Sequence, residues 1–396
     1  MNRRSLCCKL SAMLVLGVWS GVANGVDRIG TSQKGSLLIF PKIELRWKVY
    51  LSPFGGPPSG AALAQDVYLS LSNDFPDDVR VHMFFLNGDP PTSIDPGWNH
   101  IDCVFILTKN QPTFVSMANG GSGVCVPFTV LDPGSLPGRP DPDAFLFRHL
   151  RGTAYLWAEA FDSSLQKFRP IRWNHLSGEA SIVDFRNASV TKYSAYAAQV
   201  VDSADGPQHG EFVGEPGMLN LDGQDYEFAF DMLTFNFYSE DSKPYQTSSR
   251  LAQITNDLTF HPVSVDYRQD GSGPVCTKLN FRIWNQDEVQ FENTERCICC
   301  WDQTLMKNYA QPNFFLLGNL LTTIGRARVD GVASDLCPLA QHAAILGLLI
   351  ERQQFRYTSE GEPVIPSGTS FAALPMIGQG LEEARILYDP PEPTGE

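Results

Sequence analysis

The chain has 396 residues, of which 43% are hydrophobic and 19% are charged, and this balance excludes intrinsic disorder as its general state. Its 30 basic and 44 acidic residues give a formal net charge of -14, which is the wrong sign for attracting nucleic acid or an anionic membrane surface. The length predicts two or three domains, each large enough to have its own core.

Residues 1–25 have the pattern of a secretory signal peptide. A basic start is followed by an apolar stretch over 10–22, and Ala23-Asn24-Gly25 places small residues at the cleavage site. A short membrane anchor is the alternative, but the stretch is too short to span a bilayer comfortably. The paired arginines near the start leave twin-arginine export open. We therefore predict a secreted or periplasmic protein with no membrane insertion after cleavage.

Apolar residues at every second position dominate the rest of the chain, which is typical of half-buried strands. Turn-forming Pro, Gly, Asn and Asp residues are frequent between these segments. The strand candidates, in chain order, are 37–45, 67–71, 79–85, 104–107, 153–160, 181–185, 193–200, 234–238, 258–265, 278–283, 327–332 and 384–388.

One short helix is predicted near 338–349. Ser334 or Asp335 is its expected N-cap, Pro338 falls in its first turn, and an apolar run continues to about Leu349. Many short strands with a single helix predict an all-β protein of two immunoglobulin-like β-sandwich domains.

The acidic, Pro-rich segment 203–217 is the best candidate for a linker between domains. It divides the mature chain into a first domain at 26–217, which includes the linker, and a second at 218–396, with residues 218–250 of uncertain membership. Apolar positions recur in the same order in both halves, as where Leu38 and Phe40 match Leu258 and Phe260. This recurrence favours an internal duplication, although any two β-domains share such runs.

Seven cysteines follow the predicted signal peptide, and an oxidising compartment favours disulfides among them. Cys103 and Cys125 are the only pair in the first half, so we expect them to be joined. In the second half, Cys297, Cys300 and Cys337 are the expected disulfide cysteines, and Cys337 is expected to bond a member of the run from Cys297 to Cys300. The C-x-x-C spacing of Cys297 and Cys300 leaves a zinc site or a redox pair as alternatives, but we predict no metal and no cofactor.

No motif in the sequence names a reaction: the nucleophile elbow, the P-loop, the H-E-x-x-H zinc motif and the EF-hand loop are all missing. A repeated triplet is the best candidate for ligand binding, because Trp offers a flat apolar face while Asn and His offer hydrogen-bonding groups. The alternative is that each Trp packs beneath a loop that its Asn and His stabilise. The two copies are Trp98-Asn99-His100 and Trp173-Asn174-His175.

These features favour an exported, non-catalytic binding or structural protein of the cell exterior, with an extracellular protein or a glycan as its partner. The alternative function is that of a carbohydrate-active or other extracellular hydrolase whose catalytic residues lie on loops. A pocket that holds two carboxylates, or a His beside an acid and a hydroxyl, would favour the hydrolase.

The signal peptide leads to a first testable prediction. Protein recovered from its native compartment is expected to lack residues 1–25, because the cleavage site follows Gly25. Intact-mass measurement checks this directly. Full-length chain recovered from the cytoplasm would contradict it.

Overall fold

The structure is a computed structural model, and it describes 28–50, 60–90, 98, 100–120, 139–141, 144–202, 209–243, 250–268, 274–309, 312–335, 337, 342–357 and 365–389. The predicted signal peptide lies outside these residues. No helix among them is long and apolar enough to cross a membrane.

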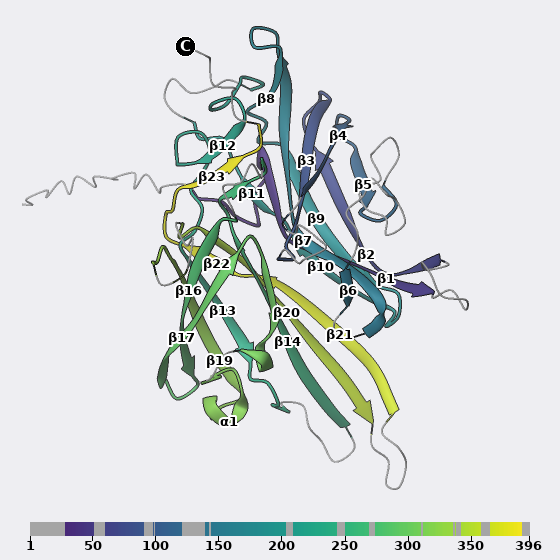
Figure 1. The fold of residues 1–396 in the computed structure, drawn as a ribbon, viewed down its shortest axis with the longest axis vertical. Coiled ribbons are helices and arrows are strands. Elements are labelled where there is room, and N and C mark those ends of the chain that lie inside the picture. The colour runs from purple at the N-terminus through teal and green to yellow at the C-terminus, as the bar shows by residue number, and fades with distance from the viewer. Residues whose placement is uncertain are drawn as a thin grey trace, which may run out of the picture.

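The first half of the chain forms a sheet of eleven strands whose main path runs β10-β9-β2-β1-β7-β3-β4 (Figure 1). β2 pairs with β1 through residues 60–65 and with β5 through residues 68–72, so the sheet passes from one layer to another along this strand. The layers enclose a core that includes Phe40, Leu69 and Leu156. The strands are β1 (Leu37–Tyr50), β2 (Gly60–Asn73), β3 (Val79–Asn87), β4 (His100–Leu107), β5 (Pro112–Ser116), β6 (Arg139–Asp141), β7 (Ala144–Asp162), β8 (Lys167–Pro170), β9 (Leu176–Asp184), β10 (Ser189–Ser194) and β11 (Tyr196–Ala198).

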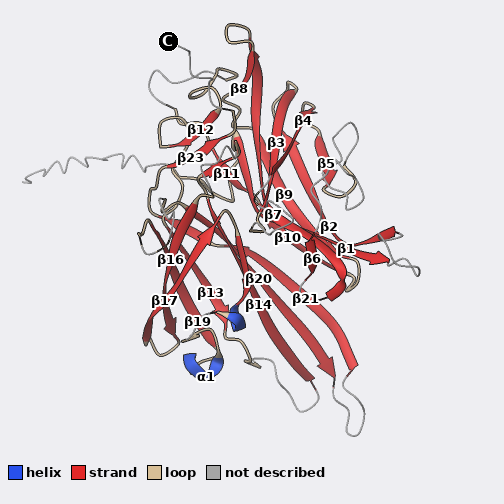
Figure 2. Cartoon of the chain, in the orientation of Figure 1, coloured by secondary structure: helices blue, strands red, loops and turns tan. Residues whose placement is uncertain are grey.

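The second half forms a five-stranded sheet of order β17-β16-β19-β13-β22, a four-stranded sheet of order β18-β14-β20-β21 and a three-stranded sheet of order β12-β23-β15. The strands are β12 (Met218–Leu221), β13 (Met232–Tyr238), β14 (Arg250–Pro262), β15 (Val265–Asp266), β16 (Cys276–Asn285), β17 (Gln290–Cys299), β18 (Asp302–Leu305), β19 (Ile324–Val332), β20 (Ile345–Tyr357), β21 (Ile365–Pro375), β22 (Ile377–Gln379) and β23 (Ala384–Leu387). Two short helical turns, η1 (Met306–Asn308) and α1 (Leu317–Leu320), are the helices among the described residues (Figure 2).

The four-stranded sheet is buried on both faces along residues 258–262 of β14 and 345–350 of β20. On one face, β14 packs against the five-stranded sheet, and the rings of Phe260 and Phe281 meet edge to face at 5.8 Å. On the other face, Leu348 and Ile350 of β20 join the core of the first half. This sheet is therefore one layer through which the two halves of the chain contact each other, and rings beside the three-stranded sheet form another contact, since Tyr267 and Tyr388 meet Phe84 and Trp157.

The predicted helix near 338–349 is wrong in its described part, because β20 begins at Ile345 and no helix precedes it from residue 342. A strand that is buried on both faces is apolar at successive positions, and over a few residues this pattern cannot be told from a buried helix.

The expectation of a nearly all-β protein of antiparallel sheets is confirmed, whereas the immunoglobulin-like topology and the duplication are not. Under the duplication, β14, β16 and β19 would correspond to β1, β2 and β7. However, β1 pairs with β2 and β7, whereas β14 pairs with β18 and β20 instead of β16 and β19. The domain boundaries stay a prediction. Within the expected linker, Val213 is buried in the core.

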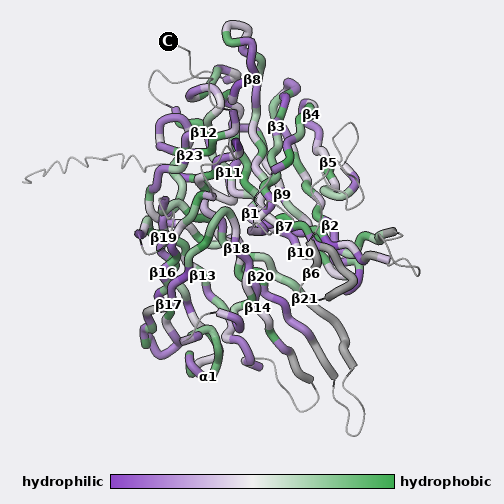
Figure 3. Tube along the Cα trace, in the orientation of Figure 1, coloured by the Kyte–Doolittle hydropathy of each residue, from purple (hydrophilic) through white to green (hydrophobic). Residues whose placement is uncertain are grey.

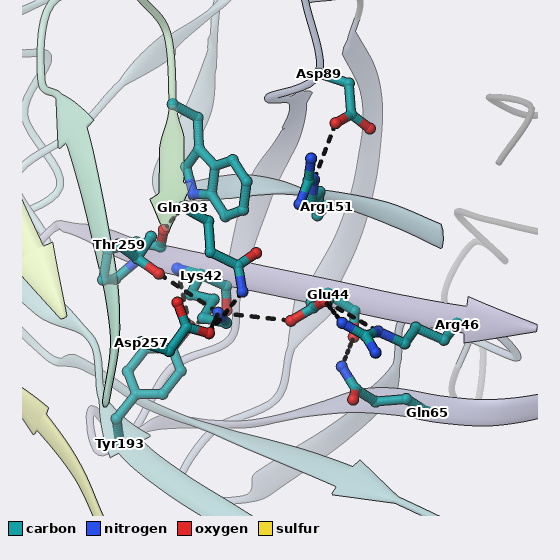
Figure 4. A network of polar contacts seen from close by, with 12 residues as sticks. Lys42, Glu44, Arg46, Gln65, Asp89, Arg151, Tyr193, Asp257, Thr259 and Gln303 are labelled. Atoms are coloured by element: carbon teal, nitrogen blue, oxygen red, sulfur yellow. Dashed lines mark hydrogen bonds and ion pairs between the residues drawn. The ribbon is translucent and has the colours of Figure 1, made fainter. Parts of the chain in front are cut away.

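A buried lysine joins the two halves (Figure 4). Lys42 lies where the pairing of β1 with β7 shifts register between Phe40 and Ile43, next to Pro41, which has no N–H to donate to the ladder. Its side chain is 2% exposed, and its Nζ lies 2.9 Å from Oδ2 of Asp257 on β14 and 3.5 Å from Oε2 of Glu44. One ammonium thus contacts a carboxylate from each half.

Glu44 is held as an anion within this network. Burial alone would raise the pKa of its carboxyl, but the charges of Arg46 and Lys42 lower it well below the usual range. Arg46 donates to Glu44 Oε1 through Nε at 3.1 Å and Nη2 at 2.7 Å, and Gln65 donates to the Glu44 carbonyl. Each charge in the network therefore has a partner of opposite sign or a hydrogen-bond donor.

His261 on β14 forms a second polar contact between the halves. Its Nδ1 lies 2.6 Å from the carbonyl oxygen of Cys300, which can only accept, so Nδ1 carries the proton. The neutral ring then accepts at Nε2 from the hydroxyl of Tyr155 on β7. Burial lowers the pKa of His261 from 6.5 to about 4.

Substitution of Lys42 is expected to destabilise the fold strongly. Lys42→Met leaves Asp257 without its cation and Glu44 with Arg46 alone, and breaking a buried pair in this way costs about 3–5 kcal/mol. Chemical denaturation measures this loss. The control is Lys192→Met, which breaks an exposed pair with Glu179 and should cost less than about 1 kcal/mol. Equal losses in the two variants would contradict the prediction.

The neutral state of His261 predicts a loss of stability in acid. Below pH 6.5 His261 of the unfolded chain binds a proton, whereas His261 of the folded chain stays neutral until about pH 4. The contribution of the neutral ring to the free energy of unfolding is therefore complete above pH 6.5 and declines as the pH falls toward 4. Between pH 6.5 and 5 the loss of unfolding free energy amounts to about 2 kcal/mol. Unfolding free energies measured at several pH values should show this component in the native chain and lack it in His261→Gln. An identical acid dependence in both proteins would show that His261 is not its source.

Candidate functional site

The second triplet stabilises a loop at the start of β9. Trp173 is buried, and its Nε1 donates to Asn73 Oδ1 at 2.9 Å. Asn174 accepts from the Ser36 hydroxyl and from the Val200 backbone through Oδ1, at 2.8 Å each. His175 pairs with Asp74 at 3.0 Å. These contacts fit the packing alternative for Trp173 and Asn174.

The first triplet lies beside other aromatic residues. Trp98 is partly buried against the core with a left-handed φ of 40°, and Asn99 lies outside the described residues. The His100 ring on β4 lies 5.3 Å from Phe84 and 5.6 Å from Tyr267, and burial lowers its pKa.

The structure does not bring the two triplets into one contact network. Asn73, which binds Trp173, is on β2, and three strands separate β2 from β4 in the sheet order: β1, β7 and β3. The rings around His175 are Phe75, Trp173 and His209, and none of these contacts His100. A ligand-binding role for either triplet stays a prediction.

Two disulfides are present among the described residues of the second half: Cys276–Cys299 and Cys297–Cys337. They are compatible with an oxidising compartment. Cys103 is also disulfide-bonded, but Cys125 lies outside the described residues, so that pairing stays a prediction.

Cys300 was expected among the disulfide cysteines, and this expectation is wrong: it is a buried free thiol, and burial raises its pKa to about 12. The reason is the alternation of side chains along the end of β17. Ile298 and Cys300 face the main core, whereas Cys299 faces Cys276 and Cys337 on the other side. No group of three or more metal-ligating side chains occurs among the described residues.

The strongest candidate for a functional site is a pocket of about 460 Å³ on the outer face of the five-stranded sheet, which we call the Trp284 groove. It crosses β16, β19, β13 and β22 and ends at the turn after β16. Its lining residues are Met232, Thr234, Trp284, Asn285, Glu288, Arg326, Arg328 and Gln379.

Alternation along the strands places the lining side chains of β13, β19 and β22, and Trp284 of β16, on the outer face. The trace in Figure 3 shows hydrophilic and hydrophobic stretches mixed along the strands of this half. Phe281 and Ile283 of β16 point into the core, so Trp284 points outward. Arg326 and Arg328 of β19 alternate in the same way with buried neighbours.

Strand register then makes neighbours of residues that are far apart in the chain. Trp284 lies directly opposite Arg326, and Arg326 lies opposite Asn236 of β13. In the adjacent row, Arg328 lies between Arg282 and Thr234. The groove is thus assembled from rows of side chains that run across three strands.

The turn between β16 and β17 forms one end of the groove. Asn285 fixes this turn, because its Oδ1 accepts from the backbone of Asp287 at 3.0 Å and of Val289 at 2.9 Å. Its amide nitrogen donates to the Leu320 carbonyl at 3.1 Å. Glu288 follows with a left-handed φ of 61° and an exposed side chain.

The arginines of this face differ in their partners. The Asp330 carboxylate accepts from Arg282 at 2.6 Å and from Arg328 at 2.8 Å, so one negative charge is shared by two positive ones. Arg326 is exposed, and no described residue forms an ion pair or a side-chain hydrogen bond with it. Of these three arginines, Arg326 is therefore the one whose guanidinium is available to a ligand.

A second pocket, of about 400 Å³, lies in the first half and is rich in hydroxyl groups. Several of its polar groups already bind one another or a neighbour: Ser72 bonds Ser177 at 2.7 Å, and Glu179 pairs with Lys192. The lysine of this lining, Lys34, pairs with Asp74, so the pocket offers a ligand hydroxyl groups and no unpaired cation among its lining residues.

Sequence reasoning identified three of the four strands behind the groove, β13, β16 and β19, but not the groove. The available signal was a set of basic and aromatic residues at the outward positions of two strands in an acidic chain. No protein-family model matches the chain, and the search of curated proteins found no match.

Proposed function

We propose that the protein is an exported, non-catalytic binding protein and that the Trp284 groove is its ligand site. The observation that carries the proposal is the groove itself, in which an indole, two guanidinium groups and an amide line one concave surface. Concave sites with one flat apolar surface and a few placed polar groups are typical of small-molecule and saccharide recognition.

The side chains of the groove suit a sugar unit of a glycan. A pyranose ring has an apolar C–H face that packs on a flat indole such as that of Trp284, while its rim of hydroxyls needs donors and acceptors. Arg326 and Gln379 are exposed and provide such groups. Three strand-to-strand steps, from β16 to β22, span about 14 Å, which leaves room for more than one sugar unit.

The groove has one carboxylate in its lining, that of Glu288. Glycoside hydrolysis generally uses two, one on each side of the scissile bond. The lining therefore supports binding more directly than the hydrolase alternative.

Truncation of the indole is expected to abolish most of the binding. Trp284→Ala removes the flat surface of the groove and should weaken binding of the preferred oligosaccharide at least about tenfold, equivalent to about 1.4 kcal/mol. Isothermal titration of the mature protein against a panel of purified oligosaccharides checks this.

The matched control is Phe114→Ala, which removes another exposed aromatic residue, on β5 in the other half. It should bind the oligosaccharide as the native chain does. Binding of an oligosaccharide that is unaffected by Trp284→Ala would place the site elsewhere.

A further inference from the structure

We infer that the sugar bound in the Trp284 groove carries a carboxylate, as in a hexuronic acid unit of an acidic polysaccharide, and that Arg326 binds this carboxylate. The inference rests on the proposed function, because it names the chemical class of the ligand for that site. It is argued from the state of Arg326, its position beside Trp284 and the arrangement of the surrounding sheet.

The guanidinium of Arg326 forms no ion pair or side-chain hydrogen bond with a residue that the structure describes. Arg282 and Arg328 on the same face bind Asp330, whereas Arg326 has no such partner among the described residues. A guanidinium presents its donors in a planar fork, and a carboxylate is the group that this fork binds through two parallel hydrogen bonds. A planar anion from the ligand would complete this site.

The distance between Trp284 and Arg326 suits one sugar unit. The two residues are direct cross-strand partners, so their Cβ atoms lie about 5 Å apart. The carboxylate of a hexuronic acid is attached directly to the ring, so it extends from the ring edge. A ring stacked on the indole can therefore direct its carboxylate toward the guanidinium next to it.

The pairing of charges on this face leaves one cation for an anionic ligand. The acids of the face, Asp330, Glu288, Glu292 and Glu295, equal its bases in number, and Glu295 pairs with Lys278. Asp330 is occupied by two of the arginines, and Glu288 is exposed to solvent at the end of the groove. The cation directly opposite Trp284, that of Arg326, is therefore the one that no described carboxylate binds.

The sheet around the groove argues for a saccharide over an acidic peptide. β16, β19 and β13 each pair with a strand on both sides. Their backbone groups are used in the ladders, so a peptide lying over these three strands finds no strand to pair with, and the edges of the sheet are β17 and β22. Recognition must come from side chains, which suits a chain of sugars.

The experiment compares hexuronate oligosaccharides with matched oligosaccharides in which each carboxyl is reduced to a primary alcohol. Titration of the mature protein should show about tenfold tighter binding of the acidic member of the preferred pair. Arg326→Gln should bring this preference to within about twofold while keeping the affinity for the reduced member. The control is Arg385→Gln, which removes an exposed arginine on β23 and should keep the full preference.

The outcomes separate this inference from the proposed function. If both members of a pair bind equally and Trp284→Ala abolishes this binding, recognition of a carboxylate is wrong, but the saccharide site at Trp284 stands. A preference that survives Arg326→Gln would also overturn the inference. Binding of only a sulfated oligosaccharide or an acidic peptide would overturn it too, and binding of no saccharide at Trp284 would overturn both proposals.

Discussion

The burial of Lys42 is the constraint on which the arrangement of the two halves depends. A charged ammonium removed from water requires nearby anions, and one of the two that it contacts, Asp257, belongs to the other half of the chain. The bulge of β1 at Pro41 directs Lys42 out of its own sheet. The same bulge exposes the Pro41 carbonyl, which accepts from Trp301 Nε1 at 2.8 Å. Trp301 packs over Gly88, where a Cβ would lie 2.6 Å from it.

The contact between the two halves of the chain determines which surfaces remain for function. The four-stranded sheet packs on both faces, so its side chains serve the two cores and the polar network between them. The five-stranded sheet is packed on its inner face, and its outer face carries the pocket. The Trp284 groove is therefore formed on a layer that is supported from behind by a filled core, which is the arrangement that holds binding side chains in fixed positions.

The sequence predicted the strands well where one face is polar and the other buried, because alternation is then visible, as in residues 278–283 of β16. It predicted a helix for residues 345–349 because a strand buried on both faces does not alternate. The Trp284 groove was missed because its residues come from segments between residues 232 and 379, which only strand register brings together. Cys300 was misassigned for a related reason: its neighbour Cys299 faces the disulfides, and Cys300 faces the core.

The net charge of the chain limits how an acidic ligand can be recognised. At physiological ionic strength, charges more than about 8 Å apart are largely screened, so the excess of acids elsewhere on the chain acts weakly on a ligand that is already in contact. At low ionic strength the same acids repel a polyanion before it arrives, because the formal charge is -14. Long-range attraction therefore cannot be the source of selectivity. Discrimination must arise where the guanidinium of Arg326 and the ligand are in direct contact, since at that distance a charge-assisted bidentate pair is strong and salt screens it least.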